Sequence, residues 1–363
     1  MSNYYIGENR LNEEQLAKLT MPEMVTATIL RSKQSLYKYF PNTIKVVNGK
    51  SRNFSLEALK NNTVYLASPR EFDDPYDCNV FVDSNNFSLQ RVRYYAALCG
   101  VKLDNDWNYA DISIHIAEKI YNHISTGNPV NSLFPLNTEN ELVSAHQELF
   151  LLMLENELRS PQASGESYYT AINRVITQEY NDMQQNANRF RIACFSQTPY
   201  SMLMWSHYAN SHKGFCIEYE IPIYSENTET IFHNLYPVIY TDIRKDLSQL
   251  SINWNSLGNI TDDELCDFYK YCLLSKSLDW KYQQEIRLIS CDDLITDENY
   301  ICQFFKIKKV YLGNQMQPDE RKEIIKICKD KGIAYVGVTI SQDRFEMRDC
   351  ENLCENCLRL KNK

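Results

Sequence analysis

Strand patterns lie toward the two ends of the chain, and helical spacing dominates its middle. Alternating or β-rich apolar runs predict strands at residues 35–40, 63–68, 189–196, 214–221, 237–242, 284–290, 308–313 and 333–340. Shorter helical patterns accompany them at residues 54–62, 201–209, 262–277 and 318–331. Because the strands outnumber these helices and their connections vary, we predict an α+β fold with a central mixed β-sheet core.

A change in composition predicts the domain organisation. Residues 86–188 are rich in Asn, Gln and Glu and carry long helical patterns, so we predict a large helical insertion within the core. The predicted boundaries are N-terminal helices at 1–36, a mixed core at 37–85 and 189–345, the insertion at 86–188, and a cysteine-containing tail at 346–363. The histidines of the insertion, His115, His123 and His146, are interpreted as surface or packing residues rather than ligands.

Composition narrows the class of protein. The chain has 363 residues, 12 scattered cysteines and a formal charge of −9. Neither a signal-peptide pattern nor an apolar run of membrane-spanning length is seen, so we expect a cytoplasmic protein without a membrane partner. The negative charge disfavours a large nucleic-acid surface but leaves room for a local basic groove. The 25 tyrosines favour aromatic-lined surfaces or clefts.

An acidic turn follows the second predicted strand. Its Ser-Pro-x-Glu pattern at 68–71 predicts a capped helix start with proline in the first turn. Asp74 and Asp77 come next, around Pro75. Either these are solvated acids of a well-capped turn, or one of them points into a cleft and binds a hydroxyl group or a metal.

Aromatic and hydrogen-bonding groups crowd residues 202–220, just before a strand pattern. Thr198 followed by Pro199 predicts the start of the intervening helix. The crowded groups are Trp205, His207, Tyr208, His212 and Lys213. They either build a site at a sheet edge or complement the dipole at the end of the helix. The two histidines are five residues apart, which does not match helical zinc-ligand spacing.

The strand pattern at 284–290 carries charges on one face. Glu285 and Arg287 alternate with Ile286 and Leu288, so the two charged side chains share a face of an otherwise apolar strand. This arrangement is typical of a salt-bridged edge or of a cleft, and both interpretations stay open.

The tail spaces Cys350, Cys354 and Cys357 as Cys-x3-Cys-x2-Cys. Three thiolates at this spacing can hold a [4Fe–4S] cluster, but only a few residues follow the motif, so we expect a reduced, partly ordered tail without a cluster. A structural metal site would need a fourth ligand. The chain also lacks a Gly-rich phosphate loop, a G-x-S-x-G elbow and an H-E-x-x-H motif.

Five stretches together resemble one bacterial family, the domain-of-unknown-function family numbered 2971. They read LYKYF, VYLASPREFDDPYDC, CFSQ, LMWSHYANSHKGFCIEY and WKYQQEIRLI, and the resemblance spans about Tyr37 to Gly313. One departure is Asp73, where the family pattern usually has Asn before Asp-Pro, so the role of this side chain stays open. The family name carries no activity. Some members resemble accessory genes near phage-defence systems, which implies a protein partner from a neighbouring defence gene.

The layout is also similar to that of ADP-ribosyltransferases, in which a first strand carries an aromatic-basic-aromatic motif and a late strand carries a glutamate. This resemblance implies that Glu285 stabilises an oxocarbenium-like ribose while tyrosines stack on the nicotinamide. NAD would then be a substrate, and no cofactor is expected. On this layout Glu285 is the glutamate, and Tyr37, Tyr39 or Tyr208 are the stacking groups. Taken with the patterns above, the expected catalytic residues are Glu285, His207 and Tyr208, and the expected ligand-binding residues are Tyr37, Tyr39, Asp74, Asp77, Ser196, Trp205, Lys213 and Arg287.

Three functions therefore stay open. The first is an ADP-ribosyltransferase-like or NAD-consuming effector in bacterial phage defence. The second is a non-catalytic module that senses a nucleotide-like small molecule or binds a protein. The third is a hydrolase or nuclease that uses Asp74, Asp77, His207 and Glu285 with a divalent metal. For the first, we expect His207 and Glu285 to face one cleft.

Overall fold

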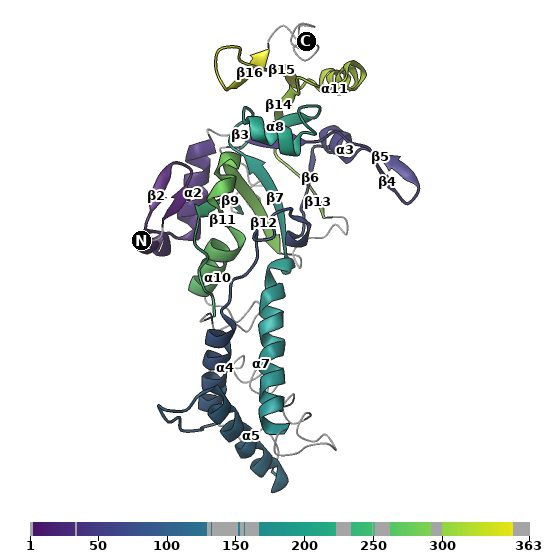
Figure 1. Ribbon diagram of the computed structural model, residues 1–363. Helices are drawn as coiled ribbons and strands as arrows, with labels where there is room; N and C mark the ends of the chain where they lie inside the picture. Colours follow the sequence, from purple (N-terminus) through teal and green to yellow (C-terminus); the bar gives the residue numbers. More distant parts are fainter. Residues whose placement is uncertain are drawn as a thin grey trace. The chain divides into compact units, whose positions relative to one another are not determined.

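The computed structural model describes residues 3–32, 35–128, 132, 152, 156, 167–222, 234–248, 250, 262–291 and 300–350 (Figure 1). The chain divides into two compact units. The first unit comprises Met1–Cys78, Asn188–Ile243 and Leu273–Lys363, and the second comprises Asn79–Ala187 and Arg244–Cys272. A large mixed multi-strand sheet together with helices confirms the α+β class.

The main sheet of the first unit has eight strands in the order β16-β15-β14-β8-β3-β7-β12-β9. Their bounds are β3 Ser35–Phe40, β7 Phe190–Ser196, β8 Phe215–Glu220, β9 Leu235–Pro237, β12 Glu285–Cys291, β14 Ile307–Leu312, β15 Ala334–Ile340 and β16 Met347–Cys350. The pair β14–β15 is parallel, and the pairs made by β3 with β7 and β8 are antiparallel. The sheet is therefore mixed, as the sequence predicts.

The sheet opens between β3 and β7. Strand β3 pairs with β8 over six residues, but with β7 the described ladder consists of Tyr37 opposite Ser196. Continuing this register would place Tyr39 opposite Cys194. Instead, the Lys38 ammonium donates to the Cys194 carbonyl at 3.0 Å. This side chain therefore satisfies a carbonyl that a backbone N–H of a neighbouring strand would otherwise satisfy. This opening positions the cavity described below.

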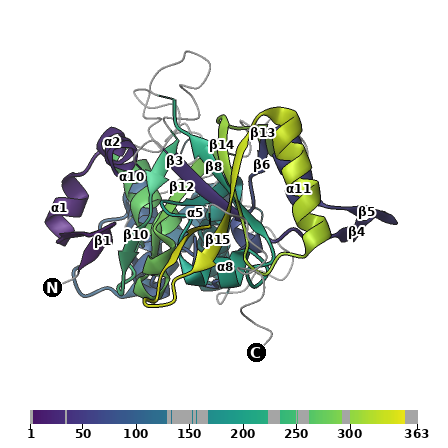
Figure 2. The same cartoon turned by 90° about the horizontal axis from the view of Figure 1, so that it is seen from above.

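The two faces of the sheet pack on different helices. On β8, Phe215, Ile217 and Tyr219 join one core cluster, to which α3 (Phe54–Asn61) and α11 (Pro318–Lys331) contribute. Cys216 lies on the other face, in a cluster built around α8 (Met202–Tyr208). The alternation expected for this strand is confirmed, and Figure 2 shows the sheet and α11 from above.

A second sheet of the first unit corrects the prediction of an all-helical N-terminus. Its order is β11-β10-β1-β2, with β1 Tyr4–Ile6, β2 Asn9–Leu11, β10 Ile239–Thr241 and β11 Ser275–Ser277. Helices α1 (Glu13–Lys18) and α2 (Met21–Ser32) follow β2. Three-residue strands are too short to show an alternation, so their partners rather than their own sequence determine them.

Three further segments differ from the prediction. The expected helix at 262–277 ends early, as α10 (Asp262–Phe268), a π-helical turn (Tyr269–Leu273) and then β11. The expected strand at 237–242 is divided between β9 and β10, which belong to different sheets. The tail predicted from residue 346 includes β16, which pairs with β15.

Smaller elements complete the first unit. They are the hairpin β4 (Lys45–Val47) and β5 (Lys50–Arg52), the pair β6 (Thr63–Tyr65) and β13 (Ile301–Gln303), and 3-10 turns at Pro69–Glu71 and Leu278–Gln283. A further 3-10 turn, Asn186–Arg189, spans the boundary between the two units in the sequence. The capping box of Ser68 and Glu71 is present, on a 3-10 turn.

The second unit contains α4 (Ser84–Leu98), α5 (Tyr109–Ser125) and α7 (Ser167–Gln185). Its bounds differ from the insertion predicted at 86–188, because it begins at Asn79 and includes Arg244–Cys272. The Arg244 guanidinium donates to the Asn79 carbonyl at 2.6 Å, a pairing over 165 residues that composition does not reveal. Within the described residues, no helix is long and apolar enough to cross a membrane.

The histidines of the second unit have local partners. His115 Nδ1 lies 2.7 Å from the Asp111 carbonyl, and His123 Nε2 lies 2.8 Å from Ser132 Oγ. His146 falls outside the described residues.

The turn between α8 and β8 is strained and tightly packed. Asn210, Ser211 and His212 all have positive φ, at 49°, 52° and 66°. A Cβ on the following Gly214 would lie 2.0 Å from the Phe40 carbonyl oxygen. The close approach of this turn to β3 therefore requires glycine at 214.

We expect Gly214→Ala to lower the free energy of unfolding by more than about 2 kcal/mol, because backbone atoms must move to admit the methyl group. Gly49→Ala is the control, since Gly49 has φ of 74° but nothing within 4 Å of an added Cβ. Gly49→Ala should lower the free energy of unfolding by about 1 kcal/mol or less. Urea unfolding measures both values, and equal losses in the two variants would contradict the packing argument.

Candidate functional site

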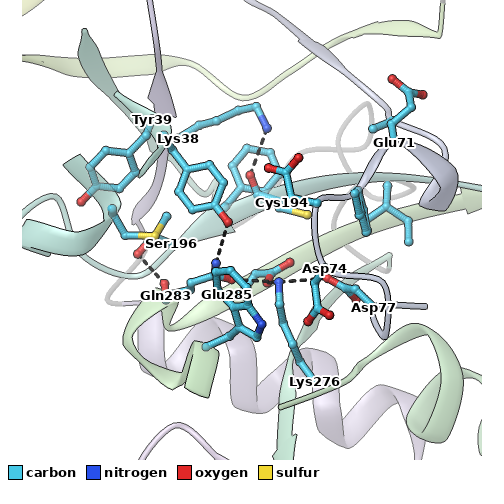
Figure 3. Close-up of a pocket in the computed structure, with 18 of the residues that line it drawn as sticks. Lys38, Tyr39, Glu71, Asp74, Asp77, Cys194, Ser196, Lys276, Gln283 and Glu285 are labelled. Atoms are coloured by element: carbon cyan, nitrogen blue, oxygen red, sulfur yellow. Dashed lines mark hydrogen bonds and ion pairs between the residues drawn. The ribbon is translucent and has the colours of Figure 1, made fainter. Parts of the chain in front are cut away.

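A cavity of about 280 Å³ lies at the opening between β3 and β7, and all of its lining belongs to the first unit (Figure 3). Strand β3 contributes Tyr37, Lys38 and Tyr39, β7 contributes Cys194, Phe195 and Ser196, and α8 contributes Met204 and Tyr208. The remaining polar and aromatic lining includes Tyr65, Glu71, Phe72, Asp73, Asp74, Asp77, Lys276, Trp280, Gln283 and Glu285. Its size is near the lower end of the range for small-molecule pockets, which begins at about 300 Å³.

Four buried charges form a network at one side of the cavity. Arg287 Nη2 donates to both oxygens of Asp77 at 2.7 Å, and Arg287 Nε donates to Glu285 Oε1 at 2.7 Å. Lys276 Nζ bridges the same two acids, at 2.8 Å from Glu285 and 2.9 Å from Asp77. Figure 3 shows Lys276 between the two carboxylates. The two acids and two bases of the network have no net charge together, and buried charges are tolerated when they are paired in this way.

The network fixes the protonation of Glu285. Burial alone would raise the pKa of this carboxyl group, but Arg287 and Lys276 outweigh burial and hold the pKa well below its usual range. Burial alone would lower the pKa of Lys276, but Glu285 and Asp77 raise it. Glu285 is therefore an anion at neutral pH.

Hydrogen bonds connect this network to α8 and β7. The Gln283 amide accepts from Lys276 at 2.9 Å and donates to the Tyr208 hydroxyl at 2.7 Å. The Ser196 hydroxyl donates to the Gln283 carbonyl at 2.7 Å. The neighbouring Gln284 has φ of 45°, so a left-handed turn orients Gln283 and Glu285 toward the same side of the site.

Tyrosines form the walls, and they are neutral. Burial raises the pKa of Tyr37 and of Tyr208 to about 12. The Tyr39 hydroxyl donates to the Thr198 carbonyl at 2.8 Å. Burial also raises the pKa of Cys194, so this lining cysteine is a thiol rather than a nucleophilic thiolate. The walls are therefore suited to stacking and hydrogen bonding.

The acidic turn supplies two differently engaged carboxylates. Glu71 Oε1 accepts from the Ser68 amide at 2.8 Å and from the Tyr65 hydroxyl at 3.0 Å. Asp74 Oδ1 accepts from the Tyr76 amide at 2.9 Å. The second oxygen of Asp74, Oδ2, is buried and has no hydrogen-bond partner within the described residues. Asp74 therefore has capacity to accept from a ligand.

Most of the predicted site residues meet in this cavity. Its lining includes Tyr37, Tyr39, Asp74, Asp77, Ser196, Tyr208 and Glu285. Arg287 is fully buried behind Glu285 and Asp77. For the strand at 284–290, the cleft interpretation holds, because Glu285 lines the cavity. The interpretation as a sheet edge does not, because β12 lies between β7 and β9, although Glu285 and Arg287 are salt-bridged.

Trp205, His207 and Lys213 are placed differently from the expectation, since the lining does not include them. Trp205 is buried in the core, where its indole N–H donates to the Pro199 carbonyl at 2.7 Å. His207 is exposed, with its ring 6.2 Å from that of Tyr282, and Lys213 is exposed in the strained turn. The N-cap of α8 is Ser201 rather than Thr198. Of the crowded stretch, Met204 and Tyr208 reach the cavity.

The site residues expected from the sequence leave out several polar or aromatic residues of the lining, among them Lys38, Lys276, Trp280 and Gln283. Lys276 was expected in a helix, whereas β11 turns it toward Glu285. Lys38 sits between two tyrosines that alternate to the other face of β3. The opening of the sheet lets residues of both faces line one cavity, and nothing in the local pattern signals that opening.

Among the described residues, no group of three or more histidine, cysteine, aspartate or glutamate side chains is arranged to hold a metal ion. Asp77 and Glu285 already bind cations of the chain itself. Cys350 lies in β16, while Cys354 and Cys357 fall outside the described residues, so the tail motif stays a prediction.

Fold and site together define an α+β protein with a tyrosine-walled cavity beside a buried ion network. Residues 204–288 match the family model described as Protein of unknown function (DUF2971), which confirms the resemblance to that family over this segment. The segment contains Tyr208, Lys276, Gln283, Glu285 and Arg287. Comparison with curated proteins and with solved structures found no match.

Proposed function

We propose that this cavity binds a nucleotide-like small molecule and that the protein is an ADP-ribosyltransferase-like or NAD-consuming effector of bacterial phage defence. The observation that carries the proposal is an anionic Glu285 beside a cavity walled by Tyr37, Tyr39 and Tyr208. The defence setting rests on the family resemblance.

In this proposal the nicotinamide ring stacks on the tyrosines, and its ribose lies near Glu285. The bond between ribose C1′ and the ring nitrogen breaks, and its electron pair leaves with neutral nicotinamide. Positive charge develops at C1′, where a preorganised carboxylate stabilises it. Water or an acceptor hydroxyl then adds to C1′ and loses a proton.

One observation favours a second candidate, a module that binds the ligand without turning it over. Both Glu285 oxygens already have cationic partners, Arg287 on Oε1 and Lys276 on Oε2. The four-charge network has no net charge, which weakens its attraction for a developing cation. The metal-dependent alternative lacks a comparable argument, because Asp77 and Glu285 are engaged by the same two cations.

The binding part of the proposal is tested by calorimetric titration with NAD, ADP-ribose and nicotinamide riboside. We expect saturable binding, weakened about 5-fold to 100-fold in Tyr37→Ala, because one aromatic stack contributes about 1–3 kcal/mol. Tyr121→Ala, which removes a 42% exposed ring in the second unit, should bind as the wild type does. No saturable binding of any of the three compounds by the wild type would contradict the proposal.

A further inference from the structure

The cavity lining carries unequal numbers of acids and bases. Its acids are Glu71, Asp73, Asp74, Asp77 and Glu285, and its bases are Lys38 and Lys276. The network of Lys276 and Arg287 neutralises Asp77 and Glu285. Three carboxylates then remain against Lys38, whose pKa is lowered by burial. The cavity therefore has an excess of negative charge.

Asp74 is the carboxylate best placed to use this excess. Its Oδ1 is satisfied by the Tyr76 amide, whereas Oδ2 is buried without a hydrogen-bond partner among the residues that the structure describes. A buried, unsatisfied acceptor costs about 1–3 kcal/mol, and more when it is charged. A ligand that brings a donor to Oδ2 recovers this cost.

The aromatic lining adds a second preference for positive charge. The rings of Tyr37, Tyr65, Tyr208 and Trp280 all line the cavity. Aromatic faces attract cations, by about 2 kcal/mol or more where the cation is desolvated. A planar cation that carries N–H donors satisfies the rings and the carboxylate together.

We infer that the cavity selects a planar organic cation with N–H donors, and that Asp74 is the residue that determines this selectivity. If the proposed function holds, on which this identification rests, the cation is the oxidised nicotinamide ring, which carries a positive charge and a carboxamide N–H. Asp74 accepts from that group through Oδ2, while Glu285 remains held by Lys276 and Arg287. The phosphates of a dinucleotide lie outside the cavity, whose size suits a ring and a sugar.

The test compares 1-methylnicotinamide, a cation, with nicotinamide, its neutral counterpart of similar size, by calorimetric titration. We expect the wild type to bind the cation about 10-fold more tightly or better, because only the cation gains from the charge of Asp74 and from cation–π contacts with the rings. Asp74→Asn removes the charge but keeps the rings, so it should lower this preference by about 3-fold or more while the share due to cation–π contacts remains. Glu220→Gln, which removes an exposed carboxylate at the end of β8 that does not line the cavity, should retain the preference.

Each outcome decides one part of the inference. Equal binding of the two compounds by the wild type overturns the selection for a cation, and an unchanged preference in Asp74→Asn overturns the role of Asp74. Urea unfolding midpoints equal to that of the wild type show that both variants are folded. A preference for the cation without any NAD turnover supports the inference and contradicts the transferase reaction, so the two failures are distinguishable.

Discussion

Replacing Arg287 with Met should lower the free energy of unfolding by about 3–5 kcal/mol, the usual cost of removing one partner from a buried ion pair. The Arg287 side chain is fully buried and donates to Asp77, Glu285 and the Leu273 carbonyl. Without it, two buried carboxylates share the single charge of Lys276. Met fills a similar volume, so the loss reports the missing charge rather than a cavity.

Urea unfolding measures this effect, with two comparisons. Arg287→Lys retains the charge but loses the separate guanidinium donors to Asp77, Glu285 and the Leu273 carbonyl, so its stability should fall between those of the wild type and Arg287→Met. Lys18→Ala breaks an exposed pair with Glu14, whose side chains are both 75% exposed, and should stay within about 0.5 kcal/mol of the wild type. If Arg287→Met unfolds at the wild-type midpoint, the network does not stabilise the fold.

Replacing Glu285 with Gln should slow NAD cleavage about 100-fold to 1000-fold, because the variant keeps the shape but lacks the anion that stabilises positive charge on the ribose. Binding of NAD should survive, since the tyrosine walls are unchanged. Initial rates of nicotinamide release measure the effect, and calorimetry measures binding. Glu220→Gln, an exposed acid at the end of β8, is the matched control and should retain the wild-type rate.

Loss of stability must be separated from loss of chemistry in this variant. Without the Glu285 charge, Lys276 and Arg287 face Asp77 alone, and the network gains a net positive charge. Rates are therefore compared at a temperature where urea unfolding shows Glu285→Gln to be fully folded. A folded variant that binds NAD and cleaves it at the wild-type rate would remove Glu285 from the mechanism.

Patterns of alternation predicted the strands that build the site. Strands β7, β8 and β12 fall within about a residue of the expected ranges, because each is long enough for its apolar face to be recognised. The shared face of Glu285 and Arg287 also followed from alternation. The pairing of Arg287 with Asp77 could not be predicted in this way, because the two residues are 210 positions apart in the chain and meet only in the tertiary fold.

Short elements and irregular pairing limited the prediction elsewhere. The apolar run before Lys276 has helical spacing, but the helix changes to a π turn at Tyr269–Leu273, and β11 then pairs with β10. The position of Lys276 in the site depends on that pairing. The opening between β3 and β7 is likewise a property of the assembled sheet, so the sequence did not indicate that Lys38 shares the cavity with Tyr37 and Tyr39.

Most of the crowded stretch at 202–220 lies outside the cavity lining. Trp205 anchors α8 to the Pro199 carbonyl, and the ring of His212 stacks with that of Trp205 at 6.4 Å. The left-handed turn at Asn210–His212 then directs the chain into β8. Tyr208 is the member that joins the hydrogen-bond network, through Gln283. Helix, turn and strand thus position one tyrosine beside Glu285.

The most direct test of the central claim is the time course of nicotinamide release from NAD, followed by chromatography with wild-type protein, with Glu285→Gln and without protein. The proposed reaction predicts release by the wild type well above the protein-free rate, and a rate about 100-fold to 1000-fold lower with Glu285→Gln. Wild-type release at the protein-free rate, in a preparation that binds 1-methylnicotinamide, would contradict NAD cleavage and assign the cavity to ligand sensing.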